Sequence, residues 1–110
     1  MKIYSISRHE FNGDQLTLLR KAGINTSTPN RDVDVFSDKE VTKLFREIKF
    51  SGYTHVFGVH PIIAMKAKEW GLKFVLFNNL QRMENDKRIF GCSLMRIYNA
   101  SNNSYDQYDL

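Results

Sequence analysis

Two nearly uninterrupted apolar runs constrain the fold of this chain more than any other feature: YTHVFGV at residues 53–59 and KFVLF at residues 73–77. A strand with one face in water alternates apolar and polar residues, whereas a strand covered on both faces is apolar almost throughout. Both runs therefore predict central strands of a sheet that carries helices on each of its faces.

Three segments carry the start signals of helices, and each lies between strand-like runs. The cap residues and their partners are Asn12 with Gln15, Ser37 with Glu40, and His60 before Pro61. The first two pairs have the spacing of a capping box, and proline is favoured at the first helical position because its missing N–H costs nothing there. The apolar stripes that follow end at Gly23, Gly52 and Gly71.

Strand-like runs at 2–7, 32–36, 53–59 and 73–77 separate these helices, and a last β-like run at 88–98 is an edge strand or a hairpin. This alternation is typical of parallel strands joined by right-handed helical crossovers. The sequence predicts an α/β chain with a small Rossmann-like three-layer fold, whose mainly parallel sheet of roughly four to six strands has helices on both faces. Residues 1–98 are expected to form a single domain, and the polar segment 99–110 is expected to be disordered.

Charge and hydropathy exclude some classes of function. The 110 residues carry a net charge of +4, which favours anionic partners, but the Lys and Arg residues are scattered, so no duplex nucleic acid is expected. No apolar run reaches the roughly 18 residues of a membrane span, and the first residues lack the pattern of a signal peptide. Cys92, the single cysteine, is expected to be a buried, unreactive thiol. The expected compartment is the cytoplasm.

Polar residues gather where three of the predicted strands end. Parallel strands bring their carboxyl ends to one edge of a sheet, which is where α/β folds bind ligands. The candidates are Ser7, Arg8, His9 and Glu10 after the first strand, His60, Pro61 and Ile62 after the third, and Asn78, Asn79, Gln81 and Arg82 after the fourth. His55 begins its strand, so it lies at the opposite edge and is expected to be structural.

The chemistry of this set suits a ligand that carries phosphate. A helix N-terminus and Arg8 can hold phosphate oxygens, while His9 and His60 can move protons near neutral pH. The amides of Asn78 and Asn79 can read a base or a ribose. No glycine-rich phosphate loop is present, which argues against a conventional NTPase or NAD-dependent enzyme, and no cofactor is expected.

Each candidate also has an alternative role. His60 can serve only as a helix cap, Arg8 can pair with Glu10 or a helix end, and His9 can be a surface residue of a loop. The Asn78–Asn79 pair can form a turn. A metal site built from His9, Glu10 and His60 lacks a recognised ligand spacing, so no metal is expected.

Four stretches resemble the small stand-alone CRISPR-associated ring nucleases, which are Rossmann-like proteins related to the sensor domains that bind cyclic oligoadenylate. They are SISRHE at 5–10, GVHP at 58–61, AKEWGLKFVLFNN at 67–79 and RIFGCSLMRIY at 88–98. Residues 25–50 resemble no part of that family, and the chain lacks the basic-glycine motif that some members carry after the fourth strand.

The resemblance implies a homodimer that binds a cyclic oligoadenylate-type second messenger and cleaves it without metal, in antiviral defence or phage counter-defence. A ribose 2′-hydroxyl would attack the neighbouring phosphate. Arg8 would stabilise that phosphate, and His9 or His60 would transfer protons. Ser7 and the backbone from Pro61 would hold phosphate together with Arg82, and Asn78 and Asn79 would touch ribose or adenine. Two alternatives stay open: a non-catalytic nucleotide sensor or sponge on the same fold, and a phage-encoded inhibitor that binds another protein.

Overall fold

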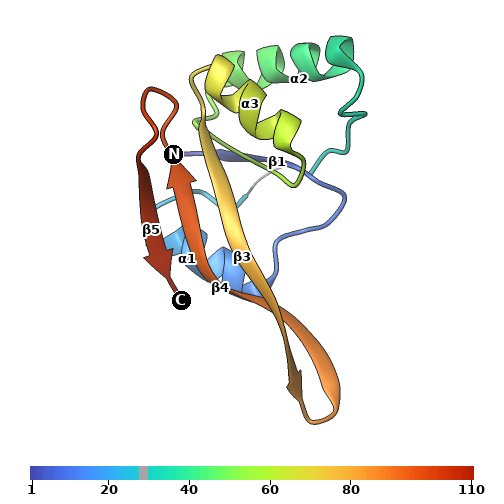
Figure 1. Ribbon diagram of the computed structural model, residues 1–110, viewed down its shortest axis with the longest axis vertical. Helices are drawn as coiled ribbons and strands as arrows, with labels where there is room; N and C mark the ends of the chain where they lie inside the picture. Colours follow the sequence, from blue (N-terminus) through green and yellow to red (C-terminus); the bar gives the residue numbers. More distant parts are fainter. Residues whose placement is uncertain (28–29) are drawn as a thin grey trace.

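The computed structural model describes residues 1–27 and 30–110, which form one five-stranded sheet and three helices (Figure 1). In chain order the elements are β1 (Ile3–Ile6), α1 (Gly13–Lys21), α2 (Asp38–Phe50), β2 (His55–Gly58), α3 (Pro61–Glu69), β3 (Lys73–Glu84), β4 (Lys87–Tyr98) and β5 (Tyr105–Asp109). Across these described residues, none of the helices has both the length and the apolar character needed to cross a membrane.

The sheet is mixed, so the predicted three-layer Rossmann-like fold with a mainly parallel sheet is wrong. Strand β2 pairs in parallel with β1 and β3, whereas β4 pairs antiparallel with β3 and β5. The strands lie in the sheet in their chain order, β1-β2-β3-β4-β5. No reversal of strand order therefore creates the switch point at which doubly wound folds bind their ligands.

The physical reason for this difference lies beyond Phe77, where the chain does not leave the sheet. Strand β3 continues to Glu84 and returns at once as β4 through Asn85 and Asp86. Both turn residues have positive φ, 50° and 63°. This is the backbone of the tight hairpin turns that asparagine and aspartate tolerate, so no helical crossover follows β3.

The strand predicted at 32–36 is also wrong. Asp32 and Asp34 accept hydrogen bonds from backbone N–H groups one and two residues further on, which gives the backbone local partners in place of a strand ladder. Beside the outer edge of β1 there are instead two isolated parallel bridges, made by Asn25 with Lys2 and by Asn30 with Ser5.

The C-terminal segment contains strand β5, where the sequence predicts disorder. Residues 105–109 pair antiparallel with β4, and the rings of Tyr98 and Tyr105 lie 5.3 Å apart between centroids. The Arg96 guanidinium lies 4.6 Å from the centre of the Tyr105 ring, and its Nε donates a hydrogen bond to Gln107. Cross-strand pairs of this kind stabilise a sheet, and the polar composition of the segment does not indicate them.

The three predicted helices are confirmed, and so are their caps. The Asn12 side chain accepts a hydrogen bond from the Gln15 backbone N–H while the Gln15 side chain accepts one from the Asn12 backbone N–H, which completes a capping box. Ser37 and His60 likewise accept hydrogen bonds from the first turns of α2 and α3. The chain therefore enters each helix at a fixed position.

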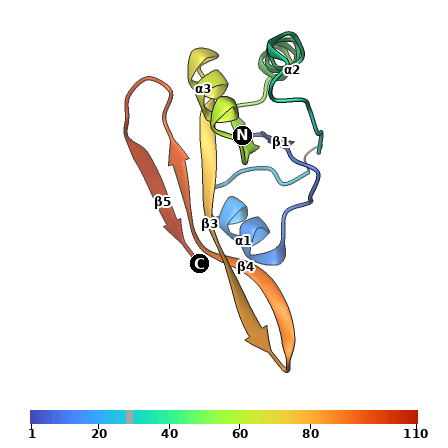
Figure 2. The ribbon, with the colours of Figure 1, turned by 45° about the vertical axis from the view of Figure 1, so that its right-hand side comes forward.

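The helices pack on opposite faces of the sheet, and Figure 2 shows α1 separated from α2 and α3 by strand β1. The core beneath α1 consists of Ile3, Leu18, Leu19, Ile24, Phe57, Val75, Phe77, Cys92, Met95 and Ile97. The core beneath α2 and α3 consists of Tyr4, Ile6, Val41, Leu44, Phe45, Ile48, Val56, Ile63, Ala67 and Leu72.

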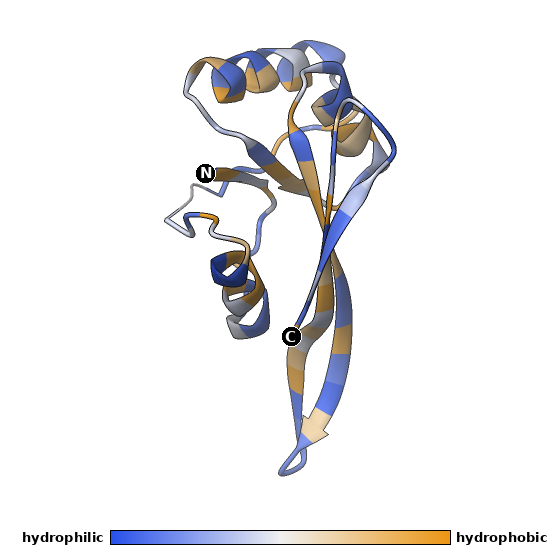
Figure 3. Cartoon of the chain, turned by 90° about the vertical axis from the view of Figure 1, so that its left-hand side faces the viewer, coloured by the Kyte–Doolittle hydropathy of each residue, from blue (hydrophilic) through white to orange (hydrophobic). Residues whose placement is uncertain are grey.

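The distal part of the β3–β4 hairpin projects beyond both cores (Figure 1). We call this part, residues 79–91, the arm. Figure 3 shows polar and apolar residues following one another along it. The side chains from 79 to 88 are all exposed, including those of Leu80 and Met83. The arm is therefore held by its hydrogen-bond ladder and its turn rather than by a core of its own.

Candidate functional site

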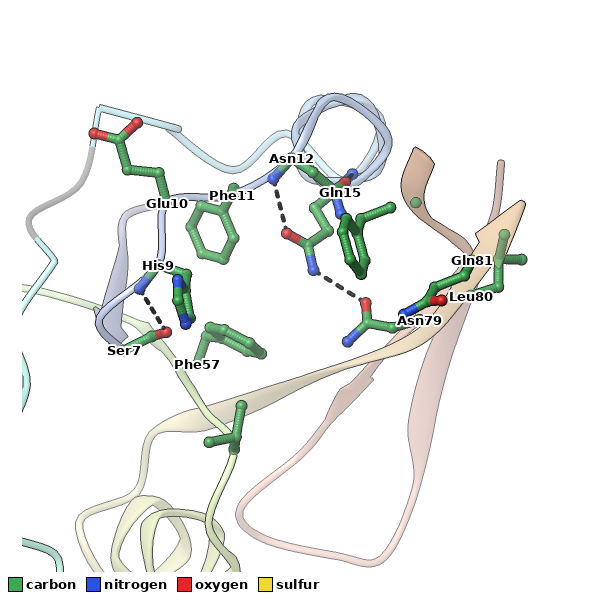
Figure 4. A pocket seen from close by; sticks show the side chains of 13 residues that line it. Ser7, His9, Glu10, Phe11, Asn12, Gln15, Phe57, Asn79, Leu80 and Gln81 are labelled. Carbon is green, nitrogen blue, oxygen red and sulfur yellow. Dashed lines mark hydrogen bonds between the residues drawn. The ribbon is translucent and has the colours of Figure 1, made fainter. Parts of the chain in front are cut away.

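A cavity of about 650 Å³ lies where the end of β1, the N-terminus of α1 and the base of the arm meet (Figure 4). Its aromatic walls come from three phenylalanines, Phe11, Phe57 and Phe90. Its polar lining includes four amides, one imidazole, one hydroxyl and one carboxylate: Asn12, Gln15, Asn79, Gln81, His9, Ser7 and Glu10. Val59, Leu80 and Gly91 complete the lining.

One wall of the cavity is a cluster of aromatic rings. Phe57, in β2, lies 5.4 Å from Phe11 and 5.3 Å from Phe77 between ring centroids. Phe11 directly precedes the cap of α1 and also packs against Phe77, at 5.9 Å. Figure 4 shows His9 on the same side of the cavity as Phe11 and Phe57. The cavity thus has a firm apolar surface that can take a flat ring.

The facing wall is a chain of amides that begins at the capping box. The Asn12 backbone N–H donates to Gln15 Oε1 at 2.9 Å, and Gln15 Nε2 donates to Asn79 Oδ1 at 3.1 Å. Gln15 is only 8% exposed, whereas Asn79 lies at the solvent side of the cavity. Helix α1 and strand β3 are therefore tied together by side chains that face the ligand space.

A second tie holds the base of the arm against α1. One carboxylate oxygen of Asp14 accepts a hydrogen bond from the Cys92 backbone N–H at 3.2 Å, and Arg82 lies 3.7 Å from the same oxygen. A Cβ on Gly91 would collide with that carboxylate. The register of the β3–β4 ladder shifts here, between Asn78 and Asn79. The tie therefore secures the arm where its ladder is irregular.

The structure brings five of the residues predicted from sequence to this cavity. Ser7, His9 and Glu10 line it from the segment after β1, and Asn79 and Gln81 line it from β3. The backbone N–H of His9 donates to Ser7 Oγ at 3.1 Å, which shapes the turn that leads into α1. All five follow apolar runs that the sequence marks as strands, which is why the sequence predicts them.

The other predicted site residues have different partners. Arg8 is exposed and lies 3.6 Å from Asp32, and Arg82 pairs with Asp14 and Glu84. Asn78 donates to Ser93 Oγ, because successive side chains of a strand point to opposite faces. In the part of the chain that the structure describes, these residues are absent from the cavity lining.

His60 and the start of α3 also lie outside the lining as the structure describes it. His60 Nδ1 accepts the Ile62 backbone N–H at 3.2 Å, and the His60 ring meets Phe36 edge to face at 5.3 Å. The turn predicted at Asn78–Asn79 is wrong, because both residues lie within β3. The ends of β1 and β2 do share an edge, with Ile6 opposite Gly58, but β3 does not end there and runs on to Glu84.

No metal centre is formed by the residues at 1–27 and 30–110: no group of three or more His, Cys, Asp or Glu side chains is placed to hold an ion. The side chains of the alternative metal set, His9, Glu10 and His60, are not brought together, because among the described residues His9 and Glu10 line the cavity and His60 does not. His60 acts as a helix cap on α3 instead.

Two titratable side chains are buried away from the cavity lining. Burial, with a smaller contribution from Lys73, lowers the pKa of His55 from 6.5 to about 4. Burial and then the nearby Asp14 charge raise the pKa of Cys92 to about 11. His55 Nδ1 lies 2.6 Å from Thr54 Oγ1, a local partner for a buried ring. The prediction that Cys92 is buried is confirmed, and its raised pKa disfavours the reactive thiolate.

Sequence reasoning missed most of the aromatic and amide lining. The apolar run around Phe57 indicates only a core residue. Phe90 lies in a β-like run for which the sequence does not indicate a pairing strand. Gln15 reads only as half of a capping box, although that box is the signal that could have found the amide chain. Its side-chain oxygen is used by the cap, so its nitrogen must find another partner.

No protein-family model, curated protein or solved structure matches this chain. The resemblance to ring nucleases therefore rests on the four short stretches alone.

The cavity is better suited to a flat, uncharged ring than to a phosphate group. No Lys or Arg is among the lining residues of the described chain. In the first turn of α1, the Gln15 backbone N–H is already engaged by the Asn12 side chain, and the carboxylate of Asp14 in the same turn opposes an anion. Aromatic walls with a few placed amides are typical of sites that bind heteroaromatic rings.

Proposed function

We propose that this chain binds a nucleotide with its base in the cavity between α1 and the arm, and acts as a sensor or sponge for that ligand. The observation that carries the proposal is the pairing of aromatic walls with a fixed chain of amides. An aromatic side chain stacked on a base contributes about 1–3 kcal/mol, and amides read the hydrogen-bonding edge.

The phosphates of such a ligand would lie outside the cavity. Arg8 adjoins lining residues in the sequence, and its ion pair with Asp32 is between exposed side chains at 3.6 Å. Exposed pairs of this kind contribute little, so Arg8 is available to an incoming phosphate. As part of the same proposal, the protein acts in the cytoplasm as a homodimer, which light scattering would detect as twice the chain mass.

Calorimetric titration with the four nucleoside 5′-monophosphates and with cyclic tetra- and hexa-adenylate tests the binding proposal. The Phe90→Ala variant should weaken binding about tenfold, because it removes a stacking surface that is 64% exposed and belongs to neither core. Met83→Ala is the matched control, since Met83 is equally exposed on the arm but does not line the cavity. Absence of binding by the wild type, or equal effects of both variants, would contradict the proposal.

Cleavage of a cyclic oligoadenylate is the second candidate, and the presence of His9 in the cavity lining favours it. His9 would take the proton from a ribose 2′-hydroxyl as its oxygen bonds to phosphorus. The bond from phosphorus to the 5′-oxygen would break, the leaving oxygen would take a proton from solvent or from the protonated His9, and a 2′,3′-cyclic phosphate would remain. Arg8 and His60, which the resemblance assigns to this reaction, do not line the cavity as described.

Incubation of metal-free protein with cyclic tetra- and hexa-adenylate, followed by chromatography, separates the two candidates. Linear products lost in His9→Ala but retained in His60→Ala would establish cleavage at this site. Intact rings that co-elute with the protein would indicate a sensor or sponge. Intact rings that do not bind would point to the remaining alternative, an inhibitor that binds another protein.

A further inference from the structure

The capping box of α1 determines which atom Asn79 presents to the cavity. A backbone N–H can only donate, so the Gln15 atom that lies 2.9 Å from the Asn12 nitrogen must be the acceptor Oε1. Nε2 of Gln15 then faces Asn79, and the Asn79 atom 3.1 Å away must be its oxygen. The remaining atom of that amide is Nδ2, a donor. In Figure 4 it lies on the side of the amide turned away from Gln15.

This orientation cannot reverse without loss. Turning the Gln15 amide would bring its NH₂ group against the Asn12 N–H, and turning the Asn79 amide would bring two NH₂ groups together. Gln15 is buried and held from both sides, because the Asn12 side chain also accepts its backbone N–H at 2.9 Å. The side-chain amides of Gln15 and Asn79 therefore each have one favoured orientation, and the backbone N–H of Asn12 sets both.

Among the described residues, Asn79 Nδ2 has no hydrogen-bond acceptor. The cavity thus holds an N–H donor of fixed position opposite its aromatic wall. We propose that Asn79 is a specificity-determining residue of this cavity and selects nucleotides whose base places an acceptor of its Watson–Crick edge, at position 1 or 6, opposite Nδ2; this inference rests on the proposed function. A base that places a donor there would lose a hydrogen bond on both sides.

Adenosine and inosine 5′-monophosphate are suitable probes, because their bases carry the same groups in opposite order. Adenine has a donor at its 6-amino group and an acceptor at N1, whereas hypoxanthine has an acceptor at O6 and a donor at N1. A fixed donor that faces position 1 or position 6 of the base must therefore prefer one of the two, whereas N3 and N7 are acceptors in both bases. Since both probes carry the same ribose and phosphate, the ratio of their Kd values isolates the base.

Two variants should invert this preference. Asn79→Asp keeps an oxygen for Gln15 Nε2 but replaces the donor in the cavity by an oxygen. Gln15→Glu keeps the capping box, which accepts Glu as well as Gln, but removes the donor to Asn79. The Asn79 amide would then turn and present Oδ1. Gln81→Glu is the control, because it adds the same charge to the lining without being part of the chain of amides.

The wild type should bind one probe about tenfold more tightly than the other by calorimetry. Both Asn79→Asp and Gln15→Glu should prefer the other probe, and Gln81→Glu should keep the wild-type ranking. Equal Kd values for the wild type, or an unchanged ranking in the two variants while binding persists, would overturn the role of Asn79 alone. A wild type that binds neither probe nor any other nucleotide overturns the proposed function, and this inference with it.

Discussion

The two halves of the β3–β4 hairpin are held in place by different forces, although one ladder of hydrogen bonds runs through both. In the half nearer the helices, Val75, Phe77, Met95 and Ile97 are buried beneath α1. In the arm, Leu80, Met83 and Phe90 face solvent, and the ladder continues as far as Glu84 opposite Lys87. Burial therefore stabilises the inner half, whereas the turn and the tie to Asp14 stabilise the arm.

The difference explains where the cavity lies. It sits at the junction, where one wall is part of the packed core and the facing wall belongs to the arm. Phe57 is buried and fixed, while Asn79 and Phe90 are exposed and depend on the position of the arm. A rigid aromatic surface thus faces side chains that a ligand can reach, as a binding site requires.

The largest expected effect on stability comes from replacing the buried methionine of the β3–β4 hairpin, and an exposed methionine in its other half is the comparison. Met95 is 0% exposed and Met83 is 63% exposed, so the same change to alanine probes burial alone. Met95→Ala should lower the free energy of unfolding by about 3 kcal/mol, since it removes packed atoms and leaves a void. Met83→Ala should change it by less than about 0.5 kcal/mol. Urea denaturation measures both, and similar losses would mean that the halves are not held differently.

Acid should destabilise the packed body through His55. Because burial lowers the pKa of this imidazole from 6.5 to about 4, the unfolded chain binds more protons between these pH values. The contribution of neutral His55 to the free energy of unfolding is fully present above pH 6.5 and is lost as the pH falls. At pH 4 the loss amounts to about 3 kcal/mol.

Comparing the urea midpoints of wild type and His55→Gln at pH 7 and pH 4.5 isolates this effect from that of the carboxylates. The variant should lose less stability on acidification than the wild type does. Parallel losses in the two proteins would show that His55 is not the group responsible.

A substitution at the junction of the arm and the core should lower the free energy of unfolding by less than one in the core. It should, however, also weaken nucleotide binding. Gly91→Ala drives a Cβ into the Asp14 carboxylate and should cost about 1–2 kcal/mol, because the bond to the Cys92 N–H is lost. Nucleotide affinity should fall with it. Gly13→Ala is the control: no atom lies within 4 Å of the added Cβ, and alanine favours a helix. If the Gly91→Ala variant had the same free energy of unfolding and the same nucleotide affinity as the wild type, the tie between Asp14 and the arm would contribute to neither.

Local signals were enough to predict the helices. The caps at Asn12, Ser37 and His60 depend on residues two or three positions away, and the structure has all three. The strands depend on distant pairing, and here sequence reasoning was less successful. Asn78–Asn79 and Asn85–Asp86 are both plausible turns, and only the ladder between β3 and β4 decides for the second.

The same distinction applies to the candidate site. Ser7, His9 and Glu10 follow β1, an apolar strand that its own residues predict, and they line the cavity. Arg8 follows the same strand, and His60 follows β2, whose end lies beside that of β1, with Gly58 opposite Ile6. Their side chains nevertheless have other partners, since Arg8 contacts Asp32 and His60 caps α3. The bond between Gln15 and Asn79 joins residues 64 positions apart, so no local pattern reveals it.

The most direct test of nucleotide binding at the junction is a titration of the ¹⁵N-labelled protein with adenosine 5′-monophosphate, followed by NMR. The resonances expected to move are the side-chain amides of Asn79 and Gln15 and the backbone amides of residues 7–12. The tip of the arm, 83–88, should stay unchanged, because those residues lie outside the cavity lining. Shifts confined to the tip or to α2 and α3, or no shifts at millimolar nucleotide, would contradict a binding site between α1 and the arm.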